Sequence, residues 1–390
     1  MRLGLILLVM LQSLAFRSRL LCLRRPMRLS SDRTTGSFKK QLVDVFPSET
    51  HYKRALRGLK GVKADTSIRN IRNQTRKLAA QTLDELMKQL TVPITEILSI
   101  YKALFRQLHP FEATVAELTV VSRVKAGLPH LDDVLNDLRL LRAMTSKIGK
   151  EYAAKASSAT SSIEAKEILT QGMAELEALY EHSPEAQSLA ALVEIQKDLR
   201  RIPIVELDTP TVVLVGSPNV GKSSIVRAVS SGTPEVNDYP FTTRGVTIGH
   251  IVDASRGLRF QVMDTPGLLD RPEEERNEME KLTFASLAHL PTAVIFVIDV
   301  SGLSGRLSTL EAQLNVRAYL KSRFPRRPWI DVVSKADLEM PPEVAAMMPS
   351  GYIPVSVQSG YNVDLLKDRI EELLYELREV LFQRAVLKAT

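Results

Sequence analysis

Hydrophobic residues between positions 38 and 201 recur at intervals of three and four, with polar residues between them. This is the period of amphipathic α-helices. The leucines at positions 131, 135, 138 and 141 form one such stripe, typical of a helix side that faces a core. Glycine is sparse here, and Pro93, Pro110 and Pro129 are expected to separate neighbouring helices. Residues 38–201 are therefore predicted to form an all-helical bundle with long antiparallel members.

The pattern changes at Pro210, where short apolar runs begin to alternate with helical segments. Predicted strands are TVVLVG, RFQVMDTPG, AVIFVIDV, WIDVVS and YIPVSV, and predicted helices are KSSIVRAVSSG, NEMEKLTFASLAHL, LEAQLNVRAYLKSR and VDLLKDRIEELLYELREVLFQRAVL. Such alternation predicts a mostly parallel sheet with helices on both faces. We expect this α/β domain to occupy residues 210–376, with residues 377–390 as the end of its last helix.

The first 35 residues differ from the rest of the chain. An apolar run from Leu3 to Phe16 is followed by five arginines, and no acidic residue occurs before Asp32. The run has the length of a signal-peptide core, and the acid-free segment after it is typical of transit peptides. Residues 1–35 are therefore predicted to be a targeting presequence, which resembles the bipartite plastid presequences of algae with complex plastids. A mitochondrial presequence and a retained membrane anchor are the alternatives.

Composition narrows the function classes. At 390 residues, with 44% hydrophobic and 25% charged residues, the chain is long enough for two to three ordinary globular domains. A single cysteine, Cys22, excludes an intramolecular disulfide, and the six histidines lack the spacing of metal ligands. A zinc or redox site is therefore not expected.

The net charge of +7 is unevenly distributed. Residues 51–80 contain nine Lys or Arg and one acidic residue, Asp65, so most of these cations are expected to lack internal partners. Such a run is either a solvated helix face or a surface that binds a polyanion such as RNA.

The segment GSPNVGKSS matches the P-loop pattern G-x-x-x-x-G-K-[ST]. It follows a predicted strand and opens a predicted helix, the context that a P-loop requires. The glycines allow backbone N–H groups to surround phosphates, Lys222 reaches the β- and γ-phosphates, and the Ser223 hydroxyl binds Mg²⁺. The predicted nucleotide contacts are Gly216, Ser217, Pro218, Asn219, Val220, Gly221, Lys222, Ser223 and Ser224.

A second phosphate-proximal element is VMDTPG, with Asp264, Thr265, Pro266 and Gly267 at the end of a predicted strand. Asp264 can hold Mg²⁺ through water, and the Gly267 N–H can meet the γ-phosphate. Between this element and the P-loop lies DYPFTTRG, where Thr242 or Thr243 can supply the switch hydroxyl that closes on the metal.

The segment VVSKADL places Ser334, Lys335 and Asp337 after a predicted strand. Guanine-reading loops have the form Asn-Lys-x-Asp or Thr-Lys-x-Asp, so a serine stands where asparagine is usual. Asp337 can accept hydrogen bonds from guanine N1–H and N2–H₂, and the Lys335 stem can pack over the base. Ser356 shapes the following turn, from which Val357 lies in reach of guanine O6. These residues predict a GTP/GDP site whose base loop is weaker than usual.

Several segments together resemble the nucleolar GTP-binding protein family, the Nog branch of the Obg-like GTPases: GSPNVGKSS, YPFTTRGVTIGH, DTPGLLDRPEEERN and SLAHL. The run from Asp264 to Asn277 is the most specific, because generic GTPases share only its first four residues. LHPF, RLLRAMTSKIGKEY and EIQKDLRRIPIVELDTPTVVLVG are similar to the family's N-terminal helical domain, so the resemblance covers residues 38–374. The long C-terminal extension of the nucleolar members is absent from these 390 residues, so their nucleolar placement is not carried over.

The resemblance implies a GTP-hydrolysing factor in assembly of the large ribosomal subunit. Its partners would be subunit precursors, rRNA and other assembly factors, with no stable membrane partner after presequence removal. The implied catalytic residues are Lys222, Thr243, Gly267 and Asn219, and the implied Mg²⁺ ligands are Ser223, Thr243 and Asp264. Asn219 matches the asparagine with which related GTPases hold K⁺. Leu268 stands where Ras-like enzymes have a water-orienting glutamine, which implies slow intrinsic hydrolysis.

Two alternatives remain for the function: a nucleotide-binding scaffold with negligible hydrolysis and a membrane-anchored regulatory GTPase. The expected location is a plastid, with the mitochondrion, or the nucleolus or nucleus, as alternatives.

Overall fold

The computed structural model describes residues 39–389 except 40, 204 and 242–245. The predicted presequence and the two switch threonines, Thr242 and Thr243, therefore lie outside the described residues. None of the described helices is both long enough and apolar enough to cross a membrane.

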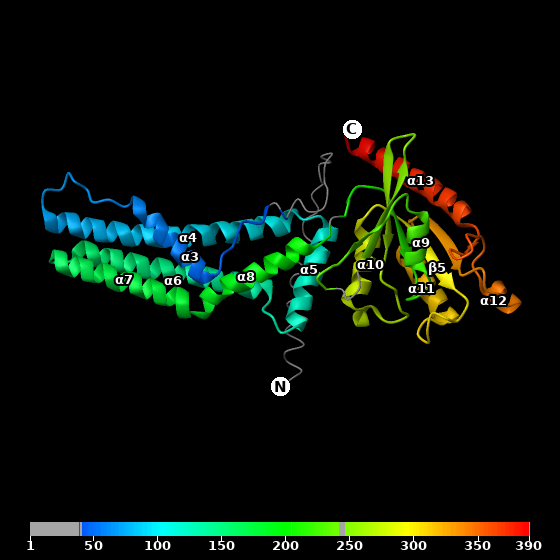
Figure 1. Ribbon diagram of the computed structural model, residues 1–390, viewed down its shortest axis with the longest axis horizontal. Helices are drawn as coiled ribbons and strands as arrows, with labels where there is room; N and C mark the ends of the chain where they lie inside the picture. The colour runs from blue at the N-terminus through cyan, green and yellow to red at the C-terminus, as the bar shows by residue number, and fades with distance from the viewer. Residues whose placement is uncertain (1–38, 40, 204, 242–245, 390) are drawn as a thin grey trace.

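The N-terminal half of the described chain is helical, as predicted. Its elements are α3 (Ser48–Gly58), η1 (Leu59–Gly61), α4 (Ile71–Gln107), α5 (Pro110–Lys125), α6 (Leu131–Ser158), α7 (Ser162–His182) and α8 (Pro184–Arg201). Helix α4 packs along α6 and α7, and α6 also packs against α8, which gives an elongated bundle (Figure 1). The four leucines of the predicted stripe are buried on α6.

Pro93 does not separate two helices, contrary to the sequence-based expectation. Helix α4 continues through it without a break. A proline removes one backbone hydrogen bond and crowds the preceding turn. Here Leu90, Ile94 and Ile97, on both sides of Pro93, are at most 3% exposed. Their packing keeps the chain helical against this local cost. Pro110 and Pro129, in contrast, lie at the start of α5 and between α5 and α6.

The C-terminal half is an α/β domain. Its seven-stranded sheet has the order β2 (Glu235–Asn237), β3 (Val246–Asp253), β4 (Leu258–Asp264), β1 (Thr211–Val215), β5 (Thr292–Asp299), β6 (Trp329–Ser334) and β7 (Ile353–Val355). Strands β4, β1, β5, β6 and β7 run parallel, whereas β3 is antiparallel to both β2 and β4. The prediction of a mostly parallel sheet is confirmed, although β2 and β3 were not predicted.

Helices α9 (Lys222–Val229), α10 (Glu278–His289), α11 (Leu310–Arg323) and α13 (Val363–Ala389) cover both faces of this sheet. The short elements η2 (Glu273–Glu275) and α12 (Pro342–Met347) bury no residue. Alternate residues of β1 enter two different cores, as the two-residue period of a strand requires. Val212 and Leu214 pack in the cluster that includes residues of α9 and α13, while Val213 and Val215 belong to the cluster that includes residues of α10 and α11. The predicted fold class is therefore confirmed.

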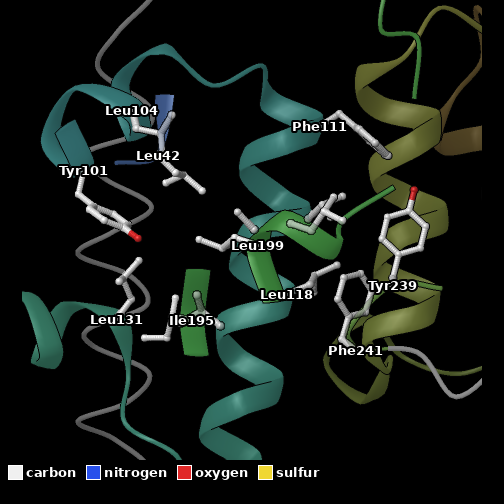
Figure 2. Packing of buried hydrophobic residues seen from close by; sticks show 14 of the residues in the cluster. Leu42, Tyr101, Leu104, Phe111, Leu118, Leu131, Ile195, Leu199, Tyr239 and Phe241 are labelled. Carbon is white, nitrogen blue, oxygen red and sulfur yellow. The ribbon is translucent and has the colours of Figure 1, made fainter. Parts of the chain in front are cut away.

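The helical domain and the α/β domain share a hydrophobic cluster. Helix α5 packs against α10, and Phe111 and Leu118 of α5 belong to the same buried cluster as Tyr239 and Phe241. Figure 2 shows Leu118 next to the Phe241 ring. It also shows Phe111 on the same side of the cluster as Tyr239. Tyr239 and Phe241 immediately precede Thr242 and Thr243 in the chain. The helical domain therefore packs against the segment that leads into the predicted switch.

The basic segment 51–80 includes most of α3 and the start of α4. Three of its cations nevertheless make polar contacts: Lys77 pairs with Asp65 at 2.7 Å, Arg76 donates to the Ser157 carbonyl at 2.8 Å, and Lys53 pairs with Glu49. Ser157 is 81 residues from Arg76 in the chain, so the helical packing supplies a partner that the composition of the segment cannot show. Lys63, Arg69 and Arg72 are exposed and make no side-chain ion pair or hydrogen bond within the described chain.

Candidate nucleotide-binding site

The predicted nucleotide contacts gather at one edge of the sheet. The P-loop follows β1, the segment Asp264–Gly267 begins at the last residue of β4, and the two base-loop segments follow β6 and β7. Because these strands are parallel, their carboxyl ends meet at the same edge, where open α/β sheets bind ligands.

Backbone geometry explains the glycines of the P-loop. A Cβ atom added at Gly216 would lie 2.4 Å from the Val297 carbonyl oxygen, so the loop can pass β5 only without a side chain. Gly221 precedes α9 with φ of 97°, and Asn219 also has a positive φ, of 63°. Such left-handed residues turn successive N–H groups toward one side, which forms an anion-binding loop at the start of a helix.

Lys222 is buried at the start of α9. Its Nζ donates to the carbonyls of Gly216 at 3.1 Å and Ser217 at 2.7 Å, so the side chain folds back over the loop. Burial lowers the pKa of Lys222 to about 8, although the nearby Asp264 carboxylate acts in the opposite direction. Burial removes water from the Lys222 ammonium group, and the phosphates of a bound nucleotide would compensate for that loss through their negative charge.

Ser223 and Asp264 meet beneath the P-loop. The Ser223 hydroxyl donates to Asp264 Oδ2, while Asp264 Oδ1 is buried and accepts no hydrogen bond. Burial raises the pKa of Asp264 despite this hydrogen bond and the nearby Lys222.

A hydroxyl beside a carboxylate with a spare acceptor suits Mg²⁺, which prefers oxygen ligands. Among the described residues there is no cluster of three or more His, Cys, Asp or Glu that could hold a metal. Nucleotide phosphates and water would therefore have to complete a Mg²⁺ site at Ser223 and Asp264.

The segment Asp264–Gly267 lies directly against the P-loop. Thr265 Oγ1 donates to the Leu214 carbonyl at 2.7 Å, and the Leu268 N–H donates to the Gly216 carbonyl at 3.0 Å. A Cβ atom at Gly267 would lie 2.5 Å from the Pro218 nitrogen. Glycine is therefore required at 267 for this close approach. The Leu268 side chain is 2% exposed and belongs to the hydrophobic core.

Ser334 connects the base loop to the P-loop. Its hydroxyl is 2.6 Å from the Val220 carbonyl and 3.2 Å from the Ile298 carbonyl, and the side chain is buried. The short serine thus reaches a P-loop acceptor, which ties the base loop to the phosphate loop.

Asp337 and Ser356 also lie together, as the predicted base site requires. The Ser356 hydroxyl donates to Asp337 Oδ1, and the Ala336 N–H donates to the Val355 carbonyl at 3.1 Å. Asp337 is exposed, so its carboxylate remains accessible to a base. Val357 follows Ser356 and is 37% exposed. The loops after β6 and β7 therefore face one another.

Asp299, at the end of β5, was not among the predicted site residues. Its Oδ2 lies 2.6 Å from Lys335 Nζ, and its Oδ1 accepts from the Ser301 N–H and hydroxyl. Burial favours a raised pKa for Asp299, but the hydrogen bonds from Lys335, Ser301 and Ser304 hold it below its usual value. Its position as an acidic residue at the end of the most apolar strand was the sequence feature that could have identified it as a site residue. Asp299 holds the Lys335 side chain, whose backbone has a positive φ of 56°.

Two protein families match adjacent parts of the chain. Residues 38–206 match the family described as "NOG1 N-terminal helical domain", and residues 211–335 match "50S ribosome-binding GTPase".

Individual relatives cover much of the chain. Nucleolar GTP-binding protein 1 of Arabidopsis thaliana is 31% identical over 78% of this chain and 42% of the relative. An uncharacterized protein of Methanocaldococcus jannaschii is 29% identical over 78% of this chain and 82% of the relative. A crystal structure described as nucleolar GTP-binding protein 1 from Plasmodium falciparum is 29% identical, covers 47% of this chain and 97% of that chain, and has a TM-score of 0.38. The chain thus spans less than half the length of the Arabidopsis relative.

Proposed function

Because the chain belongs to the nucleolar GTP-binding protein family, we propose that it is a GTP-hydrolysing assembly factor for the large ribosomal subunit. One observation carries this proposal: the Ser334 hydroxyl of the base loop donates a hydrogen bond to the Val220 carbonyl of the P-loop. The same chain also matches the family's helical domain. Guanine nucleotide would bind at the G domain, and the helical domain would bind rRNA of precursor particles. Retrieval of the protein with a non-hydrolysable GTP analogue, followed by sequencing of the attached RNA, tests this proposal. Large-subunit rRNA is expected, and its absence would contradict the role.

For hydrolysis, each residue of the site has a separate task. Lys222 places the β- and γ-phosphates, and Ser223 and Asp264 would hold Mg²⁺, which supplies neutralisation of the charge that develops on the phosphates. The Gly267 N–H would contact the γ-phosphate. Thr243 would complete the metal site in the GTP state.

Intrinsic hydrolysis should be slow because no side chain at position 268 can orient the attacking water. Leu268 is apolar and buried, so a partner must supply this task. This observation also favours the second candidate, a nucleotide-binding scaffold with negligible hydrolysis. Single-turnover hydrolysis with and without precursor particles separates the two. Acceleration by particles supports the GTPase, and an unchanged, negligible rate supports the scaffold.

We further propose that Asn219 holds K⁺ beside the phosphates. In support, Asn219 lies on the P-loop with a positive φ of 63°, and its side chain is exposed, so its amide oxygen is accessible to a cation. Replacing K⁺ with Na⁺ should slow hydrolysis, and Asn219→Ala should abolish the difference between the two cations. A rate that is indifferent to the cation would exclude this role.

Residues 1–35 are proposed to direct the protein to a plastid. The support is their apolar run followed by an acid-free, arginine-containing segment. Fusion of this segment to a fluorescent reporter should place the reporter in the plastid, and N-terminal sequencing of the mature protein should show its removal. A reporter in mitochondria would favour the first alternative, and retention of Leu3–Phe16 would favour a membrane anchor.

A further inference from the structure

Glu280, in the first turn of α10, is a carboxylate that the nucleotide site does not itself explain. Its side chain is 1% exposed. Four N–H groups surround it: Leu269 N–H at 3.1 Å and Arg271 Nε at 3.1 Å reach Oε1, while Arg271 Nη2 and the Asn277 N–H, at 3.0 Å, reach Oε2. In return, the Asn277 side-chain oxygen accepts a hydrogen bond from the Glu280 N–H at 2.9 Å, which completes a capping box at the start of α10.

A buried carboxylate is retained in a fold only when charge and hydrogen bonds compensate for lost water. Arg271 supplies both through a two-pronged contact. All of the partners come from the segment between Gly267 and α10, which contains only the short turn η2 and no strand. Its backbone N–H groups therefore have no strand partner, and the Glu280 carboxylate accepts hydrogen bonds from two of them, at Leu269 and Asn277.

Glu280 fixes this segment immediately beside Gly267. The Leu268 N–H is held by the Gly216 carbonyl of the P-loop, and the next N–H, of Leu269, is held by Glu280. Two consecutive amides are thus anchored on different parts of the domain. Because Gly267 lies against Pro218 and only Leu268 separates it from Leu269, a shift at Leu269 would be passed to the Gly267 peptide through a single residue.

The far end of the same segment is anchored separately. The Arg276 guanidinium lies 4.1 Å from the Phe284 ring centroid and 4.6 Å from that of Tyr319, and it donates to the Tyr319 hydroxyl at 3.2 Å. The segment can therefore stay folded on α10 and α11 when Glu280 changes, while its Gly267 end would keep only the contacts of Leu268 with the P-loop and the core.

We propose that Glu280, together with Arg271, is a positioning residue for the γ-phosphate contact at Gly267. This rests on the proposed function, since it requires that the Gly267 N–H meets the third phosphate. GDP has no third phosphate and so cannot make this contact. The contact between Glu280 and the segment therefore supports recognition of GTP and not of GDP.

Binding of GDP and of a non-hydrolysable GTP analogue to Glu280→Gln tests the proposal. Glutamine keeps the size of the side chain but removes the charge and turns an amide toward N–H donors. The GTP-analogue affinity should fall about tenfold, which corresponds to about 1.4 kcal/mol, while GDP affinity should stay within about twofold of the unmodified protein. The matched control is Glu278→Gln, in the same helical turn, where Glu278 pairs with Lys125 of the helical domain. It should leave the ratio of the two affinities unchanged.

An equal loss of GDP and GTP-analogue affinity in Glu280→Gln would reduce Glu280 to a structural residue and overturn the proposal. If that variant does not fold, Arg271→Lys provides the second test, because it keeps the charge and loses the two-pronged geometry. It should lower the same ratio, and an unchanged ratio would overturn the proposal. Unmodified protein that binds neither nucleotide would instead refute the proposed function.

Discussion

Ser334 departs from the usual asparagine of the base loop, yet its hydroxyl contacts the P-loop. From the sequence, serine was expected to weaken the base loop because it is shorter than asparagine. The structure places its hydroxyl 2.6 Å from the Val220 carbonyl. A Cβ atom added at Gly221 would lie only 3.8 Å from the Ser334 Cβ, so the two loops are already close. Because the loops are so close, which the sequence cannot show, the short Ser334 side chain reaches the Val220 carbonyl.

We therefore predict that Ser334→Ala lowers GTP and GDP affinity alike, by about 1 kcal/mol, the usual net contribution of one hydrogen bond. Ser334→Asn should bind nucleotide equally or more tightly. Titration calorimetry with both nucleotides measures the effect. Unchanged affinity in Ser334→Ala, or a large loss in Ser334→Asn, would show that the loop works differently.

The buried Lys222 predicts a pH dependence of stability. Its pKa in the folded protein is about 8 against an ordinary value of 10.5, so the unfolded chain binds more protons between these values. The folded state should therefore gain stability as pH rises from about 8 to about 10.5, by roughly 3 kcal/mol for this residue. Below pH 8 the full cost of burying the charge is present.

Denaturant unfolding of the nucleotide-free protein measures this contribution by comparison with Lys222→Met, which cannot titrate. The variant should be the more stable of the two near pH 7, and its advantage should shrink as the pH approaches 10.5. An advantage that is constant over this range would mean that Lys222 is not buried as described.

At the scale of elements, periodicity was sufficient for the long helices and for β1, β5 and β6, whose apolar runs are buried throughout or nearly so. It failed at Pro93, where tertiary packing overrides a local helix-breaking residue. It also failed at β2 and β3. Strand β2 has only three residues, and β3 derives its order from antiparallel pairing with β4. Such pairing depends on a partner strand and leaves a weak signal in the sequence.

The basic segment before and at the start of α4 yields a prediction for RNA binding. It lies at the end of the helical domain farthest from the sheet (Figure 1). Replacing Lys63, Arg69 and Arg72 with Gln should lower the log–log salt slope of particle binding by roughly two to three, since each phosphate contact contributes about 0.7–0.9. GTP affinity should stay the same because these residues lie outside the G domain.

A control removes three cations that already have carboxylate partners, Lys53, Lys155 and Lys197. It should change the salt slope much less for the same change in net charge. If both triple variants bind particles with the original slope, the basic segment is only a solvated surface.

At the scale of the whole molecule, the shared hydrophobic cluster joins the two domains. Leu118→Ala should lower the free energy of unfolding by about 2–5 kcal/mol through the cavity it leaves, and should separate unfolding of the helical domain from that of the G domain. Leu140 is 54% exposed on α6, so Leu140→Ala should cost less than about 0.5 kcal/mol. Calorimetry of both variants measures the effect. A single transition with unchanged stability in Leu118→Ala would show that the cluster does not couple the domains.

The motifs of the candidate site were visible in the sequence because phosphate and base recognition require particular residue types at fixed spacing. The roles of Asp299 and Glu280 were not predicted, since each acts through partners that only the fold identifies: Lys335 in one case, Leu269 and Arg271 in the other. Assignment of Thr243 to the metal stays a prediction.

The most direct test of a guanine-controlled assembly factor is capture of large-subunit precursor particles by Asp337 variants in defined nucleotides. Unmodified protein should retain particles with a non-hydrolysable GTP analogue, and much less with GDP or an ATP analogue. Asp337→Asn should lose about 2–4 kcal/mol of GTP-analogue binding and, with it, the particles. A xanthosine analogue should restore both, because the asparagine amide can donate to the xanthine C2 carbonyl. Equal capture in every nucleotide, or in Asp337→Asn with the GTP analogue, would contradict the account.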